Sequence, residues 1–205
     1  MTNVALGTRS SVVGTRIGAV VLGEVVVAAA AQVSIPLPGT PVPMTLQPMA
    51  VLLVGGLLGA RLGALSMILY LAMGAAGLPV FTPTVPIYGI ARLFGPTGGY
   101  LLAYPVAAWA VGALLTPGRR PGENPAGGVW FTPGHRPGVS RTALAVLAGI
   151  VLIHLGGLAQ LAIITGTIAG AAQLATWPFL LGDLLKIAVL VPVLARLTPT
   201  TRARL

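Results

Sequence analysis

The sequence predicts an all-α, polytopic membrane protein with six transmembrane helices and with both its N- and C-termini in the cytoplasm. Composition is the first observation: 56% of the 205 residues are hydrophobic and 7% are charged, whereas a soluble domain carries about 25% charged residues. The second is that apolar stretches near or above ~18 residues, the length that crosses a bilayer core, recur along the chain. The third is that arginines cluster in alternate connecting segments. The alternating strands of a membrane β-barrel are absent from the sequence.

The first three predicted helices lie in the N-terminal part of a single integral membrane domain that covers residues 1–205. The first helix covers residues 17–33 and is followed by a proline-rich segment. The second and third, at 49–60 and 62–77, share one apolar stretch that is broken around the cluster of glycines between Gly59 and Gly63. This stretch is short for two full crossings, so we expect one of these helices to be tilted, kinked or partial.

Longer connections separate the last three predicted helices. A loop at residues 78–96 precedes the fourth helix, at 98–115. The segment 116–140 is rich in proline, glycine and arginine and is predicted to be a linker without a core of its own. The fifth helix is predicted at 142–164 and the sixth at 178–197, with the third outer loop, after those at 34–48 and 78–96, between them at residues 165–177.

The distribution of arginines orients the predicted helices. With the N-terminus inside, the cytoplasmic segments contain all the arginines but one, namely Arg9, Arg16, Arg61, Arg119, Arg120, Arg136, Arg141, Arg196, Arg202 and Arg204. Topology therefore explains the net charge of +9 better than nucleic-acid binding does. The exception is Arg92, in an outer loop. It is either a solvated loop charge or a cation at the mouth of an outward-facing site.

Asp183 and Lys186 form the most informative pair in the chain, because they are its only aspartate and its only lysine. Their spacing of three residues places them on one face of the last helix. An ionisable side chain within a membrane costs ~2.5–3.5 kcal/mol, so such residues usually pair and mark a polar cavity. A pair that only fixes helix packing is the alternative. Together with Arg92, the local charge is +1, which predicts a small, partly apolar ligand with amide-like groups and one carboxylate.

Four ordered motifs carry a resemblance to a known family. They are IPLPGTPVPMTLQ at residues 35–47, GLPVF at 77–81, GPTGGY at 95–100 and PFLLGDLLK at 178–186. In this order they resemble BioY, the biotin-binding S component of energy-coupling factor (ECF) transporters, over about residues 17–197. The resemblance implies a multi-pass protein of the bacterial plasma membrane, surrounded by lipid, that captures biotin from outside. It also implies a transmembrane T subunit and a pair of ATPase subunits as partners.

The resemblance also implies roles for individual residues. Asp183 would accept hydrogen bonds from the ureido N–H groups of biotin, Lys186 would donate to a ligand oxygen, and Arg92 is the candidate for the carboxylate. The other predicted site residues are polar side chains of the outer loop, aromatic residues that pack on the rings or anchor the membrane interface, and one amide: Thr45, Gln47, Phe81, Tyr88, Tyr100, Trp177 and Gln160.

Two features depart from the family pattern. The segment 82–91 lacks the glycine-rich pattern that the family has there. Where the family tends to carry a tryptophan in the fifth helix, this chain has Gly157-Leu-Ala-Gln160, so an aromatic wall is either missing or replaced by the amide of Gln160. His154 lies nearby, and we expect it to be a hydrogen-bonded packing residue rather than a ligand contact.

The sequence contains no energy source of its own and no sign of an enzyme. It has no G-x-x-x-x-G-K-[ST] loop, so ATP hydrolysis would come through partner subunits, and no cofactor is expected. Three acids and two separated histidines form neither a catalytic nor a metal site, and the absence of cysteine excludes thiolate ligands. A rival hypothesis is an ion-coupled secondary transporter of a small carboxylated vitamin, with Glu24 as its proton site. The short chain and the absence of an internal repeat argue against it.

Overall fold

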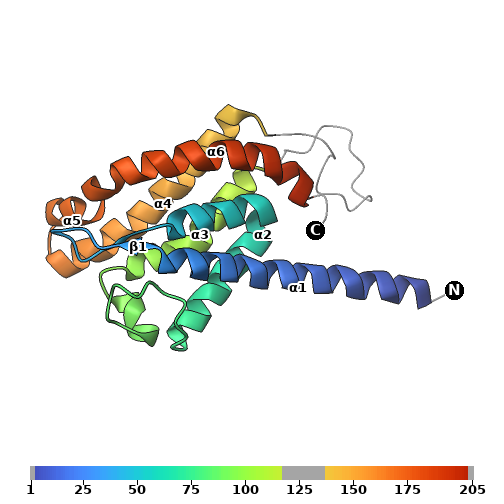
Figure 1. The fold of residues 1–205 in the computed structure, drawn as a ribbon, viewed down its shortest axis with the longest axis horizontal. Coiled ribbons are helices and arrows are strands. Elements are labelled where there is room, and N and C mark those ends of the chain that lie inside the picture. Colours follow the sequence, from blue (N-terminus) through green and yellow to red (C-terminus); the bar gives the residue numbers. More distant parts are fainter. Residues whose placement is uncertain (1–2, 117–136, 203–205) are drawn as a thin grey trace.

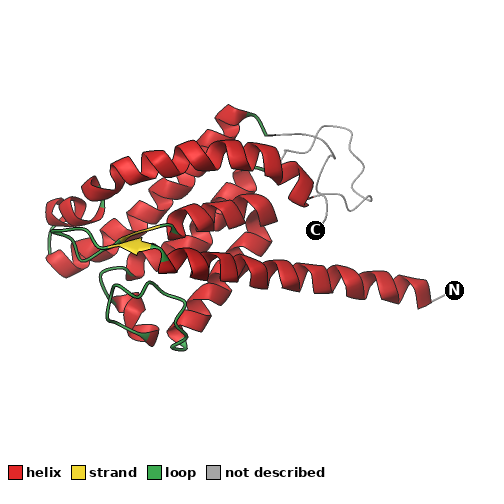
Figure 2. Cartoon of the chain, viewed as in Figure 1, coloured by secondary structure: helices red, strands yellow, loops and turns green. Residues whose placement is uncertain are grey.

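The computed structural model describes residues 3–116 and 137–202, and within these residues nearly all regular structure is helical (Figures 1 and 2). The elements in chain order are α1 (Asn3–Gln32), β1 (Ser34–Ile35), β2 (Met44–Thr45), α2 (Gln47–Ala75), the 3-10 helix η1 (Gly89–Phe94), α3 (Gly98–Leu114), α4 (Val139–Thr165), α5 (Ile168–Ala175), the 3-10 helix η2 (Trp177–Phe179) and α6 (Leu180–Arg202). The predicted all-α class is confirmed. The only strands among the described residues, β1 and β2, pair in antiparallel register.

Length and hydropathy identify several stretches that are able to cross a membrane. Four are long and apolar enough: Val13–Gln32, Gln47–Ala75, Val139–Thr165 and Ile168–Thr198. Helix α3 is apolar but shorter, at 17 residues. The two helices predicted at 49–60 and 62–77 are the two halves of α2, and α1 begins at Asn3, well before the predicted start at residue 17. Hydropathy does not identify the part of α1 before residue 17, because that part contains polar residues such as Arg9.

Helix α2 is sharply bent at Gly59. The backbone there has φ 82° and ψ 174°, a region that essentially only glycine occupies. The bend therefore lies at the start of the glycine cluster where the sequence predicts a break. Helix α3 packs directly against it, because a Cβ atom on Gly112 would lie 2.3 Å from the backbone nitrogen of Ala60. The bend thus lets α2 and α3 cross with almost no space between their backbones.

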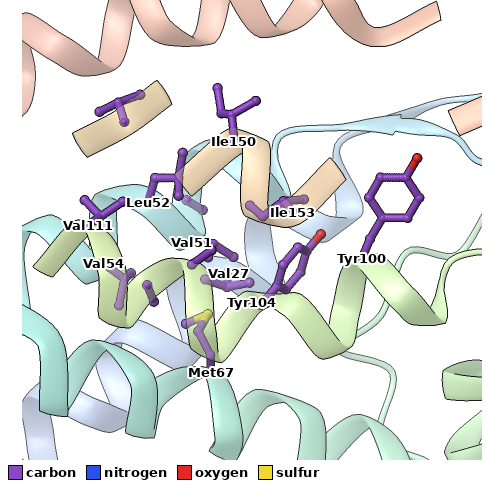
Figure 3. Packing of buried hydrophobic residues seen from close by; sticks show 14 of the residues in the cluster. Val27, Val51, Leu52, Val54, Met67, Tyr100, Tyr104, Val111, Ile150 and Ile153 are labelled. Carbon is purple, nitrogen blue, oxygen red and sulfur yellow. The ribbon is translucent and has the colours of Figure 1, made fainter. Parts of the chain in front are cut away.

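Helices α2 and α3 form the centre of the bundle. Helix α2 contacts α1, α3 and α6, and α4 contacts α3, α5 and α6. In Figure 1 the beginning of α1 extends past the other helices, on the same side of the molecule as the end of α6, while α5 and β1 lie at the opposite end. Figure 3 shows the core between them, with Val27 of α1, Met67 of α2 and Val111 of α3 close to Ile150 and Ile153 of α4.

The loop between α4 and α6 contains a helix that the sequence analysis did not predict. Helix α4 ends at Thr165 and is capped by Gly166, which has a positive φ of 75°, and α5 begins directly after Thr167. The Thr167 hydroxyl accepts a hydrogen bond from the backbone N–H of Gly170 at 3.1 Å and so caps α5. Eight residues are too few for an apolar periodicity to stand out in the sequence. The last helix consequently begins at Leu180, after Pro178 in η2.

The predicted linker at 116–140 falls mostly outside the described residues, and Arg119, Arg120 and Arg136 lie there. Arg141, at its end, is described. Its Nε and Nη2 atoms donate to the carbonyl oxygens of Leu114 and Thr116, both at 2.6 Å. Such bonds satisfy carbonyl groups that the C-terminus of a helix leaves without partners, so this arginine joins α4 to the end of α3.

Candidate ligand-binding site

A cavity opens among the beginnings of α2, α3 and α6, the middle of α4, and η1. The empty space among its side chains, including open solvent at the mouth, is about 610 Å³. Its charged and amide-bearing side chains are Gln47, Arg92, His154, Asp183 and Lys186. Aromatic and aliphatic side chains line the remainder. An apolar cavity with a few convergent polar groups is the usual form of a small-molecule site.

Asp183 and Lys186 pair as their spacing predicts. Lys186 Nζ lies 3.0 Å from Asp183 Oδ1, and both side chains are buried. Because Asp183 lies in the first turn of α6, its carboxylate also benefits from the positive end of the helix dipole. The predicted pairing on one helical face is therefore confirmed, and the pair lines a cavity as an intramembrane charge pair is expected to do.

His154 of α4 makes the second contact to Asp183. Its Nε2 atom lies 2.6 Å from Asp183 Oδ2, and its Nδ1 atom lies 3.2 Å from the carbonyl oxygen of Ala175. Its ring also packs near the rings of Tyr100 and Phe179. The expectation of a hydrogen-bonded histidine is met, but its partner is the central carboxylate of the cavity. Sequence reasoning missed this contact, although an imidazole within an apolar helix signals that a polar partner must lie nearby.

Arg92 is buried in η1, with 1% of its surface exposed. Its guanidinium donates to three backbone carbonyl groups, those of Thr82, Val85 and Ile87. The interpretation of Arg92 as a solvated loop charge is therefore wrong, because the loop folds around the side chain. Burial lowers the pKa of Arg92 from its ordinary value, yet a guanidinium stays protonated in proteins.

Two residues that line the cavity each carry a buried polar atom without a hydrogen-bond partner among the described residues. Among the described residues, four buried side-chain nitrogen or oxygen atoms have no hydrogen-bond partner, and two of them, Arg92 Nε and Thr97 Oγ1, belong to residues that line the cavity. A buried polar group without a partner costs about 1–3 kcal/mol. Arg92 Nε is a donor and the Thr97 hydroxyl can donate, so an oxygen-bearing ligand that reached these atoms would remove that cost.

Thr45 and Gln47 line the cavity through a hydrogen-bond network at the start of α2. The Thr45 hydroxyl lies 3.2 Å from Gln47 Oε1, and Gln47 Nε2 lies 2.6 Å from the Tyr70 hydroxyl. Tyr70 in turn donates to the carbonyl oxygen of Val80 at 3.2 Å. This network fixes the amide of Gln47 at the cavity wall and joins α2 to the segment that leads to Phe81.

Two predicted aromatic residues contribute to the cavity wall, and the ring of each packs directly on a glycine, one in α2 and the other in α4. Phe81 packs on Gly74, where a Cβ atom would lie 2.1 Å from its ring, and Tyr100 packs on Gly157, where the corresponding distance is 2.2 Å. The Tyr100 hydroxyl donates to the carbonyl oxygen of Ala175. Tyr100 therefore presents a fixed ring to the cavity rather than an available hydroxyl. Phe179 and Tyr104 also line the cavity and were not predicted.

Three predicted site residues lie outside the cavity. Tyr88, directly before η1, and Trp177, the first residue of η2, are 74% and 66% exposed. Their positions fit the alternative interpretation as interfacial anchors. Gln160 donates instead to the carbonyl oxygens of Leu93 at 3.0 Å and Gly95 at 2.7 Å. Gln160 thus holds the end of η1 against α4, and through η1 it supports Arg92.

The sequence profile of the BioY family matches residues 5–203, nearly the whole chain. The chain belongs to the BioY family. It is 37% identical over 161 residues to a probable biotin transporter BioY of Pyrococcus horikoshii, a match that covers 78% of this chain and 83% of the relative. It is 33% identical over 167 residues to the biotin transporter BioY of Thermotoga maritima, covering 82% of this chain and 86% of that one.

A solved structure shares the fold of this BioY-family chain. It is described as the S-component for biotin from an ECF-type ABC transporter, and it superimposes with a TM-score of 0.72 over 96% of this chain and 93% of the other. Sequence identity between the two is 22%. The bundle described here is therefore the S-component fold, and the BioY relatives are named as transporters rather than as enzymes.

Proposed function

We propose that this chain is the substrate-capture subunit of a biotin uptake system and binds biotin in the cavity between α2, α3, α4 and α6. The observation that carries the proposal is that the Asp183–Lys186 pair and Arg92 line one cavity. The identity of the ligand is inferred from the names of the BioY relatives, which are biotin transporters. The proposal assigns the chain no cofactor and no catalytic step.

The cavity suits the two ends of biotin. Asp183 is an acceptor for the ureido N–H groups, and Lys186 is a donor for a ligand oxygen. The valerate carboxylate would meet Arg92 Nε and the Thr97 hydroxyl, the atoms that have no partner within the described part of the chain. The rings of Tyr100 and Phe81 would pack against the apolar sulfur ring.

The proposed orientation places the cavity at the outer face of the cell membrane, with six crossings and both termini in the cytoplasm. In support, the beginning of α1 and the end of α6 lie on one side of the molecule (Figure 1), and arginines concentrate near them. The two halves of α2 would count as two short crossings around the Gly59 bend. Large apolar side chains exposed on α1, α4 and α6, such as Leu22, Leu144 and Leu181, would face lipid.

The proposed partners are a T subunit and a pair of ATPase subunits, which the ECF type of the matching structure suggests. The chain carries no phosphate-binding loop. Purified chain in detergent should therefore bind biotin without ATP, and reconstituted vesicles should accumulate biotin only when these partners are present with ATP.

The decisive experiment measures biotin binding to the purified protein by calorimetry. Asp183→Asn and Lys186→Ala should each weaken binding at least about a hundred-fold, because removing one partner leaves a buried charge uncompensated. Arg196→Ala is the matched control, since Arg196 is exposed on the same helix, and it should bind like the wild type. Wild-type affinity in both Asp183→Asn and Lys186→Ala would refute the proposed site.

The environment of Glu24 supports a second candidate function, ion-coupled secondary transport. Its side chain is buried in α1, and its Oε1 atom has no hydrogen-bond partner among the described residues. Such a carboxyl group is the kind that carries a coupling proton in secondary transporters. Uptake into vesicles at constant ATP distinguishes the two functions: collapse on adding a protonophore supports ion coupling, and unchanged uptake supports the ATP-dependent system.

A further inference from the structure

The two ring nitrogens of His154 both face oxygen atoms. Nδ1 lies 3.2 Å from the carbonyl oxygen of Ala175, and Nε2 lies 2.6 Å from Asp183 Oδ2. A neutral imidazole has one N–H group and one bare nitrogen, whereas an imidazolium has two N–H groups. A neutral His154 ring can therefore donate to only one of these two oxygen atoms, whereas an imidazolium can donate to both.

The partners decide where the protons lie. A backbone carbonyl cannot donate, so the contact with Ala175 requires hydrogen on Nδ1. The contact with Asp183 then requires a second proton between Nε2 and Oδ2. Because Lys186 Nζ lies 3.0 Å from the other oxygen, Oδ1, the carboxylate form of Asp183 is favoured, and the second proton belongs on His154.

No other described group at the cavity supplies that proton. Tyr100 of α3 faces His154 with its ring, and its hydroxyl donates to the same Ala175 oxygen. From α6, Asp183 and Lys186 face it, and η2 and α5 contribute only the Phe179 ring and the Ala175 carbonyl. The remaining titratable groups that line the cavity among the described residues are Arg92 and Tyr104.

We propose that His154 is a positioning residue that acts as an imidazolium, clamps Asp183 Oδ2, and makes ligand capture dependent on its second proton. A carboxylate has about four lone-pair sites. His154 and Lys186 occupy one on each oxygen, which leaves acceptor capacity on both for ligand N–H groups. The site charge becomes +2 before an anionic ligand enters, instead of the +1 obtained from Asp183, Lys186 and Arg92. This inference rests on the proposed function and names a residue that the family resemblance leaves unassigned.

Loss of the second proton should weaken capture. A neutral ring keeps one N–H group, so a bare nitrogen then faces either Asp183 Oδ2 or the carbonyl oxygen of Ala175. One of the two contacts is lost, and His154 holds Asp183 less firmly. Histidine is the side chain whose charge ordinarily changes within the range of physiological pH. Ligand affinity should therefore be highest at the acidic end of that range and fall as the pH rises.

The experiment is a titration of biotin binding to the purified full chain between pH 6 and pH 9, where the biotin carboxylate stays ionised. Wild-type affinity should fall about ten-fold or more across this range. His154→Phe, which keeps an aromatic ring, and His154→Gln, which keeps a donor, should each bind more weakly at pH 6 and show a flat profile. His135→Gln alters the only other histidine and should keep the wild-type profile.

Nitrogen-15 NMR of the histidine rings tests the protonation directly and requires no substitution at His154. The chain has two histidines, so His135→Gln leaves the signal of His154 alone. Two ring N–H groups at pH 6, one of them lost at higher pH together with biotin affinity, support the proposal. A ring with one N–H at pH 6, or a wild-type pH profile in His154→Gln, overturns it. Failure of the wild type to bind biotin at any pH would instead overturn the proposed function.

Discussion

Single residues determine the shape of the cavity as well as its charge. Asp183 and Lys186 were predictable from sequence, because a spacing of three residues fixes their relation within one helix. The contact of His154 with Asp183 was not, because it depends on how α4 packs against α6. Composition likewise could not tell that Tyr100 faces the cavity while Tyr88 is exposed, since the exposure of an aromatic side chain depends on which segments pack around it.

The unsatisfied Nε atom of Arg92 leads to a prediction about ligand selectivity. Arg92→Ala should weaken biotin binding about ten- to a hundred-fold, the range expected for a hydrogen bond between charged groups. It should weaken binding of biotin amide much less, because the amide has no carboxylate. Competition between the two ligands on the purified variant measures the difference. Equal losses for the two ligands would show that Arg92 does not bind the carboxylate.

The contact between Gly157 and Tyr100 leads to a second prediction. Gly157→Ala places a Cβ atom within 2.2 Å of the Tyr100 ring, so the ring must move away from its hydrogen bond to Ala175. We expect a loss of stability of about 1–3 kcal/mol, as for other overpacked sites, with weaker biotin binding. Gly18→Ala is the control, because a Cβ atom there meets nothing within 4 Å. Thermal unfolding with and without biotin measures both effects, and unchanged values in Gly157→Ala would contradict the packing argument.

At the scale of elements, the position of the bend in α2 could be predicted but its consequence could not. A cluster of glycines in an apolar stretch signals a break, and the structure places it at Gly59. The crossing with α3 became visible only in three dimensions, because it depends on Gly112 meeting Ala60. Helix α5 and the 3-10 helices were missed because each is too short to carry a periodic pattern.

The bend leads to a prediction about stability. Gly59→Ala should destabilise the protein by about 1–3 kcal/mol, because alanine would be held in a backbone region that is strained for residues with a Cβ atom. Gly14→Ala, in an open part of α1, is the control and should not lower stability, because alanine favours a helix more than glycine does. Thermal unfolding in the same detergent provides the comparison. Equal melting temperatures for the two variants would mean that α2 straightens without cost.

At the scale of the whole molecule, composition and charge sufficed for the fold class, because they depend on the solvent around the chain rather than on its packing. The number of crossings is harder to derive. Each half of α2 is shorter than the roughly 20 residues that usually span a bilayer. Hydropathy alone therefore finds α2 as one long stretch, whereas the glycine cluster divides it into two helices.

The proposed orientation leads to a labelling prediction. The chain has no cysteine, so single cysteines can be introduced without a background signal. Pro41→Cys, in the exposed loop between β1 and β2, should react in intact cells with a membrane-impermeant maleimide, and Ser140→Cys, exposed at the start of α4, should react only after permeabilisation. The reverse pattern would invert the topology and place the cavity at the cytoplasmic face.

The support of Arg92 by main-chain oxygens has a further consequence for how such a protein can diverge. Carbonyl groups are present whatever side chains accompany them, so the loop from residue 82 to residue 87 can exchange its amino acids and still hold the guanidinium. This chain lacks the glycine-rich pattern at 82–91, yet its arginine is fully enclosed. The loop sequence can therefore change while the buried guanidinium is kept, because the backbone conformation of the loop, rather than its side chains, holds Arg92 in place.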